Sequence, residues 1–191
     1  MVMKIMNKKD IVRKKIKTIR ENLKIEEKHR LSSIIIEKFL NLEEIKKSKV
    51  IMSYMDFKNE VETRELNKKL LEIGKEVLVP KIDENDKIVP VVLKEEYRTG
   101  KYGILESKGE NFLENKIDIV IVPGIAFNEK GERIGFGKGY YDRFFSEYFK
   151  KNKNILKISL LYDFQIDNSF VGENHDEKID ILITEQRIIK L

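Results

Sequence analysis

Glycines and charged side chains crowd the segment 123–145, PGIAFNEKGERIGFGKGYYDRFF, in an arrangement suited to binding phosphate. Glycine occupies the alternate positions 135, 137 and 139, where it lets the backbone approach a ligand closely. An amphipathic helix is expected from about Tyr140, so its first N–H groups and the positive end of its dipole would point at that ligand. Arg133 and Lys138 add positive charge beside the glycines. The segment therefore predicts a polyphosphate site.

Asp142 stands in the first turn of this expected helix, beside the predicted phosphates. An acid at such a position is most often a helix cap or a partner of the helix dipole. Next to phosphate, however, two anions would face each other unless a cation lay between them. Magnesium binds through one or two carboxylates together with substrate phosphates. The second interpretation therefore predicts a magnesium–nucleotide site.

Two common nucleotide motifs do not fit the segment. The P-loop requires Ser or Thr after its Gly-Lys pair, whereas Lys138 is followed by Gly139 and Tyr140. The dinucleotide fingerprint is a tight G-x-G-x-x-G turn directly after a strand, whereas G-x-G-x-G here follows a long loop. A loop of this length inside a compact domain is usually functional.

Hydrophobic periodicity predicts alternating strands and helices. Helices are expected over residues 7–23, 26–40, 62–74 and 139–150, and strands over 50–55, 76–80, 88–93, 118–122, 156–162, 180–184 and 187–190. This alternation predicts a single α/β domain over residues 1–191, with three layers: a mostly parallel, open, Rossmann-like sheet and helices on both faces. Ligands of such sheets bind beyond the carboxyl ends of the strands, where the loops 54–60 and 123–138 would lie.

Composition narrows the class of protein. The chain has no cysteine, which excludes disulfides, thiolate metal sites and a cysteine nucleophile. Lys and Arg number 38 against 33 Asp and Glu, and the resulting charge of +5 is spread along the chain, as on a solvated surface with a modest preference for anionic ligands. The densely charged N-terminus does not resemble a signal peptide, and no apolar run reaches membrane-spanning length. We expect a cytoplasmic monomer without membrane or nucleic-acid partners.

A basic stripe runs along the first predicted helix. At about 100° per residue, the apolar residues form one face, and the edge of that face carries Lys9, Arg13, Lys17 and Arg20. Such a stripe is usually a solvated helix face. It could also contact nucleic acid, although the helix lacks interleaved exposed aromatics. A third possibility is that the stripe borders a ligand site, and the residues alone leave all three open.

The segment 123–145 closely resembles the signature of the 5-formyltetrahydrofolate cyclo-ligase family, also called methenyltetrahydrofolate synthetases. The resemblance extends over essentially the whole chain, with a Lys-x-x-x-Arg pair on the first helix, Glu60-Val-Glu-Thr63 after the first strand, and His175-Asp176 near the end. It implies an enzyme that uses ATP and Mg²⁺ to convert 5-formyltetrahydrofolate into 5,10-methenyltetrahydrofolate, with release of ADP and phosphate.

The resemblance also implies roles for individual residues. ATP would be bound by Lys9, Arg13, Arg133, Gly135, Gly137, Lys138, Gly139, Tyr140 and Tyr141, of which Arg133 and Lys138 would be catalytic. Met55, Glu60, Tyr102, Phe136 and Tyr140 would contact the folate, and Asp142 and Asp176 would bind Mg²⁺. Tyr141 could instead turn into the core. Lys17 and Arg20, the rest of the basic stripe, are expected at the surface.

The residues after the first strand allow two interpretations. Asn59 with Glu62 fits a variant of the capping box, and Glu60 fits an ordinary acid at a helix entry. In the similar family, the acid matching Glu60 holds the pterin-like ring. An aminopyrimidinone ring offers adjacent N–H donors that one carboxylate can accept, so this role is chemically sensible.

Two other classes of function compete with this one. Another ATP-using enzyme of small molecules could share the scaffold, because a fold does not determine function. A nucleic-acid-binding protein could use the basic first helix, and its binding would depend steeply on salt. The length of the match over residues 123–145 favours the cyclo-ligase, with phosphoryl transfer to the formyl oxygen as the step that ATP makes possible.

Overall fold

A seven-stranded sheet forms the centre of the computed structural model, which describes residues 7–112, 116–148, 155–173 and 176–191, apart from the Tyr102 side chain. Its strands are β1 (Val50–Met52), β2 (Glu76–Ile82), β3 (Ile88–Val92), β6 (Ile119–Ile121), β9 (Leu156–Leu160), β10 (Ile181–Ile183) and β11 (Ile188–Lys190). They lie in the order β11-β10-β9-β6-β1-β2-β3. Neighbours pair in parallel from β10 to β2, and the edge strands β3 and β11 are antiparallel. The predicted, mostly parallel sheet is confirmed.

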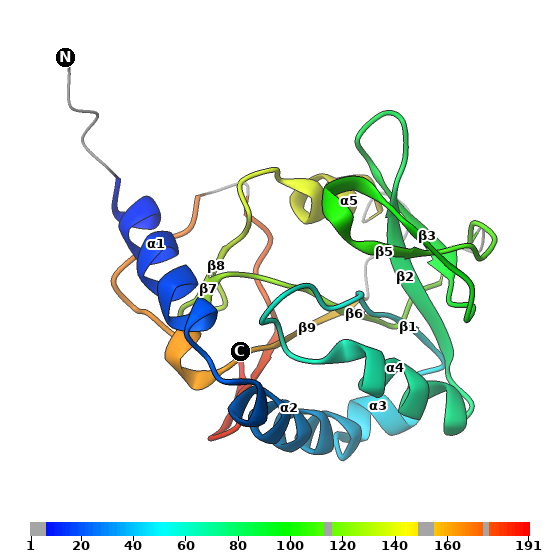
Figure 1. Cartoon of the computed structure of the whole chain (residues 1–191), viewed down its shortest axis with the longest axis horizontal. Helices are drawn as coiled ribbons and strands as arrows, with labels where there is room; N and C mark the ends of the chain where they lie inside the picture. The colour runs from blue at the N-terminus through cyan, green and yellow to red at the C-terminus, as the bar shows by residue number, and fades with distance from the viewer. Residues whose placement is uncertain (1–6, 113–115, 149–154, 174–175) are drawn as a thin grey trace.

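Helices cover both faces of this sheet, and the helices of the two faces are separated by it in Figure 1. One face packs against α2 (Ile25–Leu40), α3 (Glu43–Lys47) and α4 (Thr63–Glu72). The other face packs against α5 (Tyr140–Tyr148), through the buried Phe144 and Phe145. Strand residues alternate between the two cores, so that Ile51 faces the first and Met52 the second. The predicted three-layer α/β fold is therefore confirmed.

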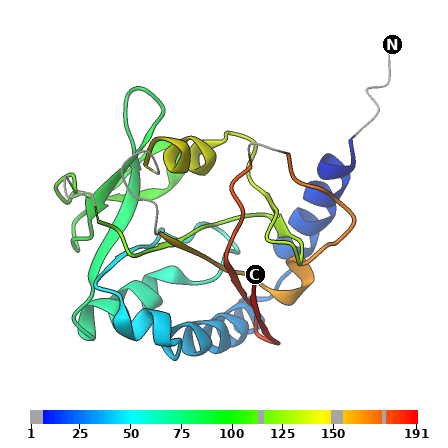
Figure 2. The same ribbon diagram turned by 180° about the vertical axis from the view of Figure 1, so that it is seen from behind.

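The first helix, α1 (Lys8–Glu21), packs at the end of the sheet and not on either face. Its buried Val12 and Ile16 contact the hairpin of β7 (Ala126–Phe127) and β8 (Arg133–Ile134), and this docking is visible in Figures 1 and 2. That hairpin follows β6, so α1 lies beyond the carboxyl ends of the parallel strands. The basic stripe is thereby brought to the edge of the sheet where ligands of α/β proteins bind.

The order of the strands reverses between β1 and β6. From β1 the chain moves outward to β2 and β3, then returns to the other side of β1 and moves outward again through β6, β9, β10 and β11. The loop after β1 leads to α4 on one face, and the loop after β6 leads to α5 on the opposite face. These two loops separate at the carboxyl ends of adjacent strands, which is the position where open α/β sheets bind ligands.

Short elements were not predicted, and several boundaries differ. The expected loop 123–138 contains the β7–β8 hairpin, and further unpredicted elements are α3, η1 (Lys101–Gly103), η2 (Asp163–Gln165) and the pair β4 (Tyr97–Thr99) and β5 (Leu105–Ser107). The strands expected to reach residues 55 and 162 end at Met52 and Leu160. The β7–β8 turn depends on Gly131, which has φ +77° and whose absent Cβ would lie 2.4 Å from the Ile179 carbonyl oxygen. Only glycine fits there.

Helix length bears on the predicted absence of a membrane partner. A transmembrane helix needs about 20 apolar residues, whereas α2 has 16 residues and carries Lys, Arg and Glu. Within the described ranges, no helix combines the length and the apolar character that crossing a bilayer requires. The cytoplasmic location stays a prediction.

Two adjacent leucines of α4 provide a test of the packing. Leu70 is fully buried, whereas Leu71 is 44 % exposed. We expect Leu70→Ala to lower the free energy of unfolding by about 2–5 kcal/mol, because it leaves a cavity between α4 and the sheet. Leu71→Ala is the matched control and should cost no more than about 1 kcal/mol. Urea denaturation of both variants measures the difference, and equal costs would contradict the packing described.

Candidate functional site

The glycine loop opens α5 as the sequence predicts. Gly137 and Gly139 have φ values of +87° and +63°, which residues with side chains rarely adopt. The space where a Gly137 side chain would stand is open, so glycine is needed there for the backbone conformation. Phe136 and Lys138 project from this loop into solvent, with Phe136 51 % exposed. The loop and the first turn of α5 thus combine open backbone, a helix dipole and a lysine, which suits an anionic ligand.

Arg133, on β8, lies against the first turn of α5. Its guanidinium donates to Asp142 Oδ1 at 2.7 Å and lies 5.9 Å from the centre of the Tyr141 ring. The Arg133 side chain is 8 % exposed, yet its Nε has no hydrogen-bond partner among the described residues. The Tyr141 hydroxyl is also buried without a partner in that part of the chain, and burial raises the pKa of Tyr141. Buried polar atoms normally have partners, so these two atoms mark a place for a ligand or bound water.

Both residues predicted to bind Mg²⁺ contact cationic side chains. Asp142 pairs with Arg133, and Asp176 accepts from Lys9 Nζ at 3.1 Å. Over the residues that the structure describes, no group of three or more His, Cys, Asp or Glu side chains could hold a metal ion. The structure does not test the metal ion itself, and His175 lies outside the described residues.

The Lys9 and Arg13 pair of α1 reaches the predicted site. Arg13 Nε donates to the Gly135 carbonyl oxygen at 3.4 Å, and its guanidinium also pairs with Asp10. Lys9 is buried enough to lower its pKa, but its hydrogen bonds to Glu173 and Asp176 outweigh this effect and raise the pKa overall. Lys9 is therefore charged at neutral pH. Of the two cations of α1, Arg13 contacts the glycine loop and Lys9 contacts Asp176. Of the four residues in the basic stripe, only Lys17 fits the description of a solvated basic face.

Glu60 is buried in the loop after β1. Its carboxylate accepts from the Phe57 N–H at 3.0 Å, and the Tyr162 hydroxyl donates to its carbonyl oxygen at 3.1 Å. Burial raises the pKa of Glu60, whereas the nearby Arg20 and the Phe57 N–H lower it. Met55 is buried in the same loop, with its sulfur 3.8 Å from the Asn67 amide nitrogen. The two residues predicted to contact the folate ring from this loop therefore share one buried environment.

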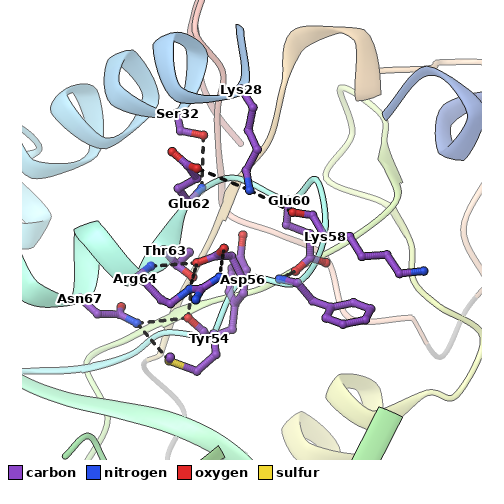
Figure 3. Close-up of polar contacts among 12 residues, drawn as sticks. Lys28, Ser32, Tyr54, Asp56, Lys58, Glu60, Glu62, Thr63, Arg64 and Asn67 are labelled. Carbon is purple, nitrogen blue, oxygen red and sulfur yellow. Dashed lines mark hydrogen bonds and ion pairs between the residues drawn. The ribbon is translucent and has the colours of Figure 1, made fainter. Parts of the chain in front are cut away.

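Asp56 positions this loop against α4, a role that sequence reasoning missed. Figure 3 shows its carboxylate directed at Arg64, and Oδ1 accepts from the Arg64 backbone N–H at 3.0 Å. Thr63 Oγ1 donates to the Tyr54 carbonyl oxygen at 2.6 Å. The alternative of an Asn59–Glu62 capping box is wrong, because Glu62 makes no capping hydrogen bond. Asp56, from outside the helix, satisfies the Arg64 N–H at the start of α4. The Glu62 N–H, which the box would have paired with Asn59, donates to Ser32 Oγ instead.

The loops after β1 and β6 face each other. Glu60, from the first loop, is close enough to Tyr141 on α5 to raise the pKa of that tyrosine, although burial contributes more. Tyr141 in turn contacts Arg133. The interpretation that Tyr141 belongs to the core is partly right, because its ring packs there. Two charged residues nevertheless act on its hydroxyl: Arg133 lowers the Tyr141 pKa and Glu60 raises it. Glu60, predicted to contact folate, and Tyr141, predicted to contact ATP, are thus near enough to interact electrostatically.

Tyr140 and the region of Tyr102 lie at the turn between β2 and β3. The Tyr140 hydroxyl donates to Asp86 Oδ1 at 3.3 Å, and Lys101 Nζ donates to the same oxygen at 2.6 Å. Side chains from η1 and from the start of α5 therefore share Asp86 as a partner. The Tyr102 side chain itself lies outside the described part of the structure, so its predicted contact with folate stays a prediction.

Arg20 does not lie at the surface as expected. It is 8 % exposed, and its guanidinium pairs with Glu60 Oε1 at 3.8 Å. Its position could have been read from the sequence, because Val12, Ile16 and Arg20 follow at intervals of four residues and are the buried positions of α1. An arginine on the buried face of a helix requires an anionic partner.

These features define an α/β protein of the Rossmann-like type, with a charged candidate site where the strand order reverses. The model of the 5-formyltetrahydrofolate cyclo-ligase family matches residues 5–185. The chain therefore belongs to that family, and the predicted class of enzyme, a ligase, is confirmed.

Relatives match along most of their length. A probable 5-formyltetrahydrofolate cyclo-ligase of Schizosaccharomyces pombe is 33% identical, over 82% of this chain and 84% of its own. The 5-formyltetrahydrofolate cyclo-ligase of Haemophilus influenzae is 30% identical, over 92% of this chain and 97% of its own. The solved structure of Aquifex aeolicus 5,10-methenyltetrahydrofolate synthetase superimposes with a TM-score of 0.82 at 36% identity, covering 96% of this chain and 92% of that one. Fold and family thus agree.

The cap that Asp56 provides can be measured. We expect Asp56→Ala to lower the free energy of unfolding by about 1–3 kcal/mol, because the Arg64 N–H loses its partner in a partly buried place. Asp56→Asn keeps an oxygen acceptor and should cost less. Arg64→Met is the control: it keeps the backbone bond and removes an arginine that is 57 % exposed, so it should cost no more than about 1 kcal/mol. Urea denaturation distinguishes the three variants, and equal costs for Asp56→Ala and Arg64→Met would contradict the capping role.

Proposed function

We propose that the protein converts 5-formyltetrahydrofolate into 5,10-methenyltetrahydrofolate in a reaction that consumes ATP and requires Mg²⁺. The observation that carries the proposal is the meeting of two loops at the reversal of strand order, in a chain of this family. One loop brings the buried Glu60, and the other brings Arg133 and the glycine loop. The name of the Aquifex aeolicus protein, a 5,10-methenyltetrahydrofolate synthetase, supports the same product.

The need for ATP follows from the chemistry of the substrate. The formyl group on N5 is an amide, so its carbon resists attack by N10 and its oxygen is a poor leaving group. Transfer of the γ-phosphoryl group to the formyl oxygen releases ADP and gives an iminium phosphate. N10 then attacks the formyl carbon and loses its proton, and the C–O bond breaks to release inorganic phosphate. This sequence requires positioning and charge neutralisation and no covalent enzyme nucleophile.

The residues present can supply the required positive charge. In the proposal, Lys138 and the N–H groups at the start of α5 hold the phosphates, and Lys9 and Arg13 approach from α1. Arg133 would contact the transferred group, and its buried Nε, which is unpaired among the described residues, supports this role. Fixed charges in a site with little water are effective because they need not reorient as charge develops.

The proposed Mg²⁺ would bind at the start of α5. Asp142 would be one ligand, with ATP oxygens and water completing the coordination, and Asp176 would be the second carboxylate. Mg²⁺ would neutralise the phosphates. In this arrangement each carboxylate would share its charge between the metal ion and a protein cation, because Asp142 already contacts Arg133 and Asp176 already contacts Lys9.

The first test is direct. The purified protein is mixed with 5-formyltetrahydrofolate, ATP and Mg²⁺, and the near-ultraviolet absorbance of the methenyl product is followed. We expect product only in the complete mixture, with none after omission of ATP or addition of a metal chelator. Folded protein that binds nucleotide and forms no product would overturn the proposal. ATP hydrolysis without folate would instead indicate a different ATP-using enzyme on this scaffold.

Lys138 provides a test of the phosphate contacts. We expect Lys138→Ala to raise the KM for ATP by about ten- to hundredfold, because a charge-assisted hydrogen bond to phosphate is lost. The KM for 5-formyltetrahydrofolate should change much less. Lys130→Ala is the control, since Lys130 is an exposed lysine in the β7–β8 turn. Steady-state kinetics with each substrate varied in turn measures both constants. An unchanged KM for ATP would remove Lys138 from the site.

A further inference from the structure

Arg20 and Glu60 form a buried ion pair between α1 and the loop after β1. Each side chain is 9 % exposed, and the guanidinium nitrogen lies 3.8 Å from the carboxylate oxygen. The Asn59 side-chain amide also donates to the Arg20 carbonyl oxygen, which fixes the end of α1 against the same loop. In the part of the chain that the structure describes, Glu60 is the ion-pair partner of Arg20. The pair therefore links the helix that carries Lys9 and Arg13 to the loop that carries Glu60.

Burial of this arginine is costly, which suggests a use beyond stability. Arg20 occupies the third position of the buried series Val12, Ile16 and Arg20, where a hydrophobic side chain would pack without loss of hydration. Replacement of a buried ion pair by apolar residues is often neutral or stabilising. The fold itself thus has no need of a charge here, whereas Glu60 does.

Among the described residues, Glu60 has few other sources of positive charge. The groups that face it are Arg20 from α1, Lys28 from α2, Tyr54 and Asp56 from its own segment, Tyr141 from α5, and the Tyr162 hydroxyl, which follows β9. Burial has the largest effect and raises the Glu60 pKa, Asp56 raises it further, and Arg20 is the strongest influence in the opposite direction. Lys28 acts more weakly and contacts Glu62 at 3.4 Å.

We propose that Arg20 is a positioning residue that keeps Glu60 ionised and oriented to receive the N–H donors of the substrate's aminopyrimidinone ring. The inference rests on the proposed function, because it takes the folate ring as the ligand of Glu60. A carboxylate can accept two adjacent N–H bonds only when it is ionised, since the protonated form turns one oxygen into a donor. Arg20 pairs with Glu60 Oε1 and need not contact the substrate.

The expected signature is a change in pH dependence. Without Arg20, the acid limb of kcat/KM for 5-formyltetrahydrofolate should move to higher pH by about one to three units, because a nearby opposite charge lowers a carboxyl pKa by that amount. Arg20→Met should therefore raise the KM for the folate about tenfold or more near pH 7, with recovery at higher pH. The KM for ATP should change little.

Two variants separate this role from a merely structural one. Arg20→Lys keeps the charge and should restore most of the wild-type pH profile. Lys17→Met, which removes an exposed lysine from the same helix, should leave the profile unchanged. In a Glu60→Gln background, Arg20→Met should add little to the loss of folate affinity, because the group on which Arg20 acts is gone. An unshifted acid limb in folded Arg20→Met, or independent losses in the double variant, would overturn the inference.

A measurement without turnover distinguishes failure of this inference from failure of the proposed function. The Glu60 carboxyl carbon can be titrated by NMR in protein carrying ¹³C-labelled glutamate, with its signal assigned by its disappearance in Glu60→Gln. We expect a higher Glu60 pKa in Arg20→Met than in wild type. An unchanged pKa would overturn the inference even if the wild type makes the methenyl product. A raised pKa in an inactive wild type would sink the folate reaction and retain the effect of Arg20 on Glu60.

Should Arg20→Met fail to fold, the comparison of Arg20→Lys with Arg20→Gln replaces it. Both side chains are polar and long, and they differ in the charge. The same displacement of the acid limb and of the Glu60 pKa is then expected between these two variants. Equal profiles would overturn the inference.

Discussion

The reversal of strand order between β1 and β6 determines where every candidate contact lies. Because α4 and α5 follow these adjacent strands on opposite faces, the loops that precede the two helices separate at the carboxyl edge of the sheet. One loop contributes Glu60 and the other contributes Arg133. The docking of α1 on the β7–β8 hairpin then adds a third source of side chains from the same side. Three segments remote in sequence thus meet in one place.

Charge pairing is the second constraint on this site. Arg133 contacts Asp142, Lys9 contacts Asp176, and Glu60 contacts Arg20, so that each buried or half-buried charge has an opposite partner. An unpaired charge in such a place would be costly. Anionic phosphates would add negative charge beside Asp142 and Asp176. A divalent cation between carboxylate and phosphate is the simplest way to neutralise that charge. The pairing therefore gives a physical reason for combining cations and acids in the proposed ATP site.

Local sequence patterns predicted most of the fold. The strands of the sheet, four helices and the three layers follow from hydrophobic periodicity, because long elements have a strong pattern. The elements that were missed are short: α3 has five residues, and β7 and β8 have two each. Two-residue strands have no periodicity to detect, and here they exist because Gly131 permits a turn against Ile179. The glycine loop and the start of α5 were visible because their chemistry lies within one continuous segment.

The contacts of Arg20 and Asp56 show what local reasoning cannot reach. The four-residue spacing places Arg20 on the buried face of α1, but its charge made the edge of that face the expected position. Burial of the Arg20 guanidinium is acceptable because it pairs with Glu60, which is forty residues away in the sequence. Asp56 likewise accepts a hydrogen bond from the Arg64 N–H at the start of α4. The two residues are eight positions apart, which is farther than a capping motif spans. Both contacts require the tertiary fold before their partners are known. They also fix the loop that carries Glu60 from both sides, so the residues that sequence reasoning missed are those that hold the predicted ones in place.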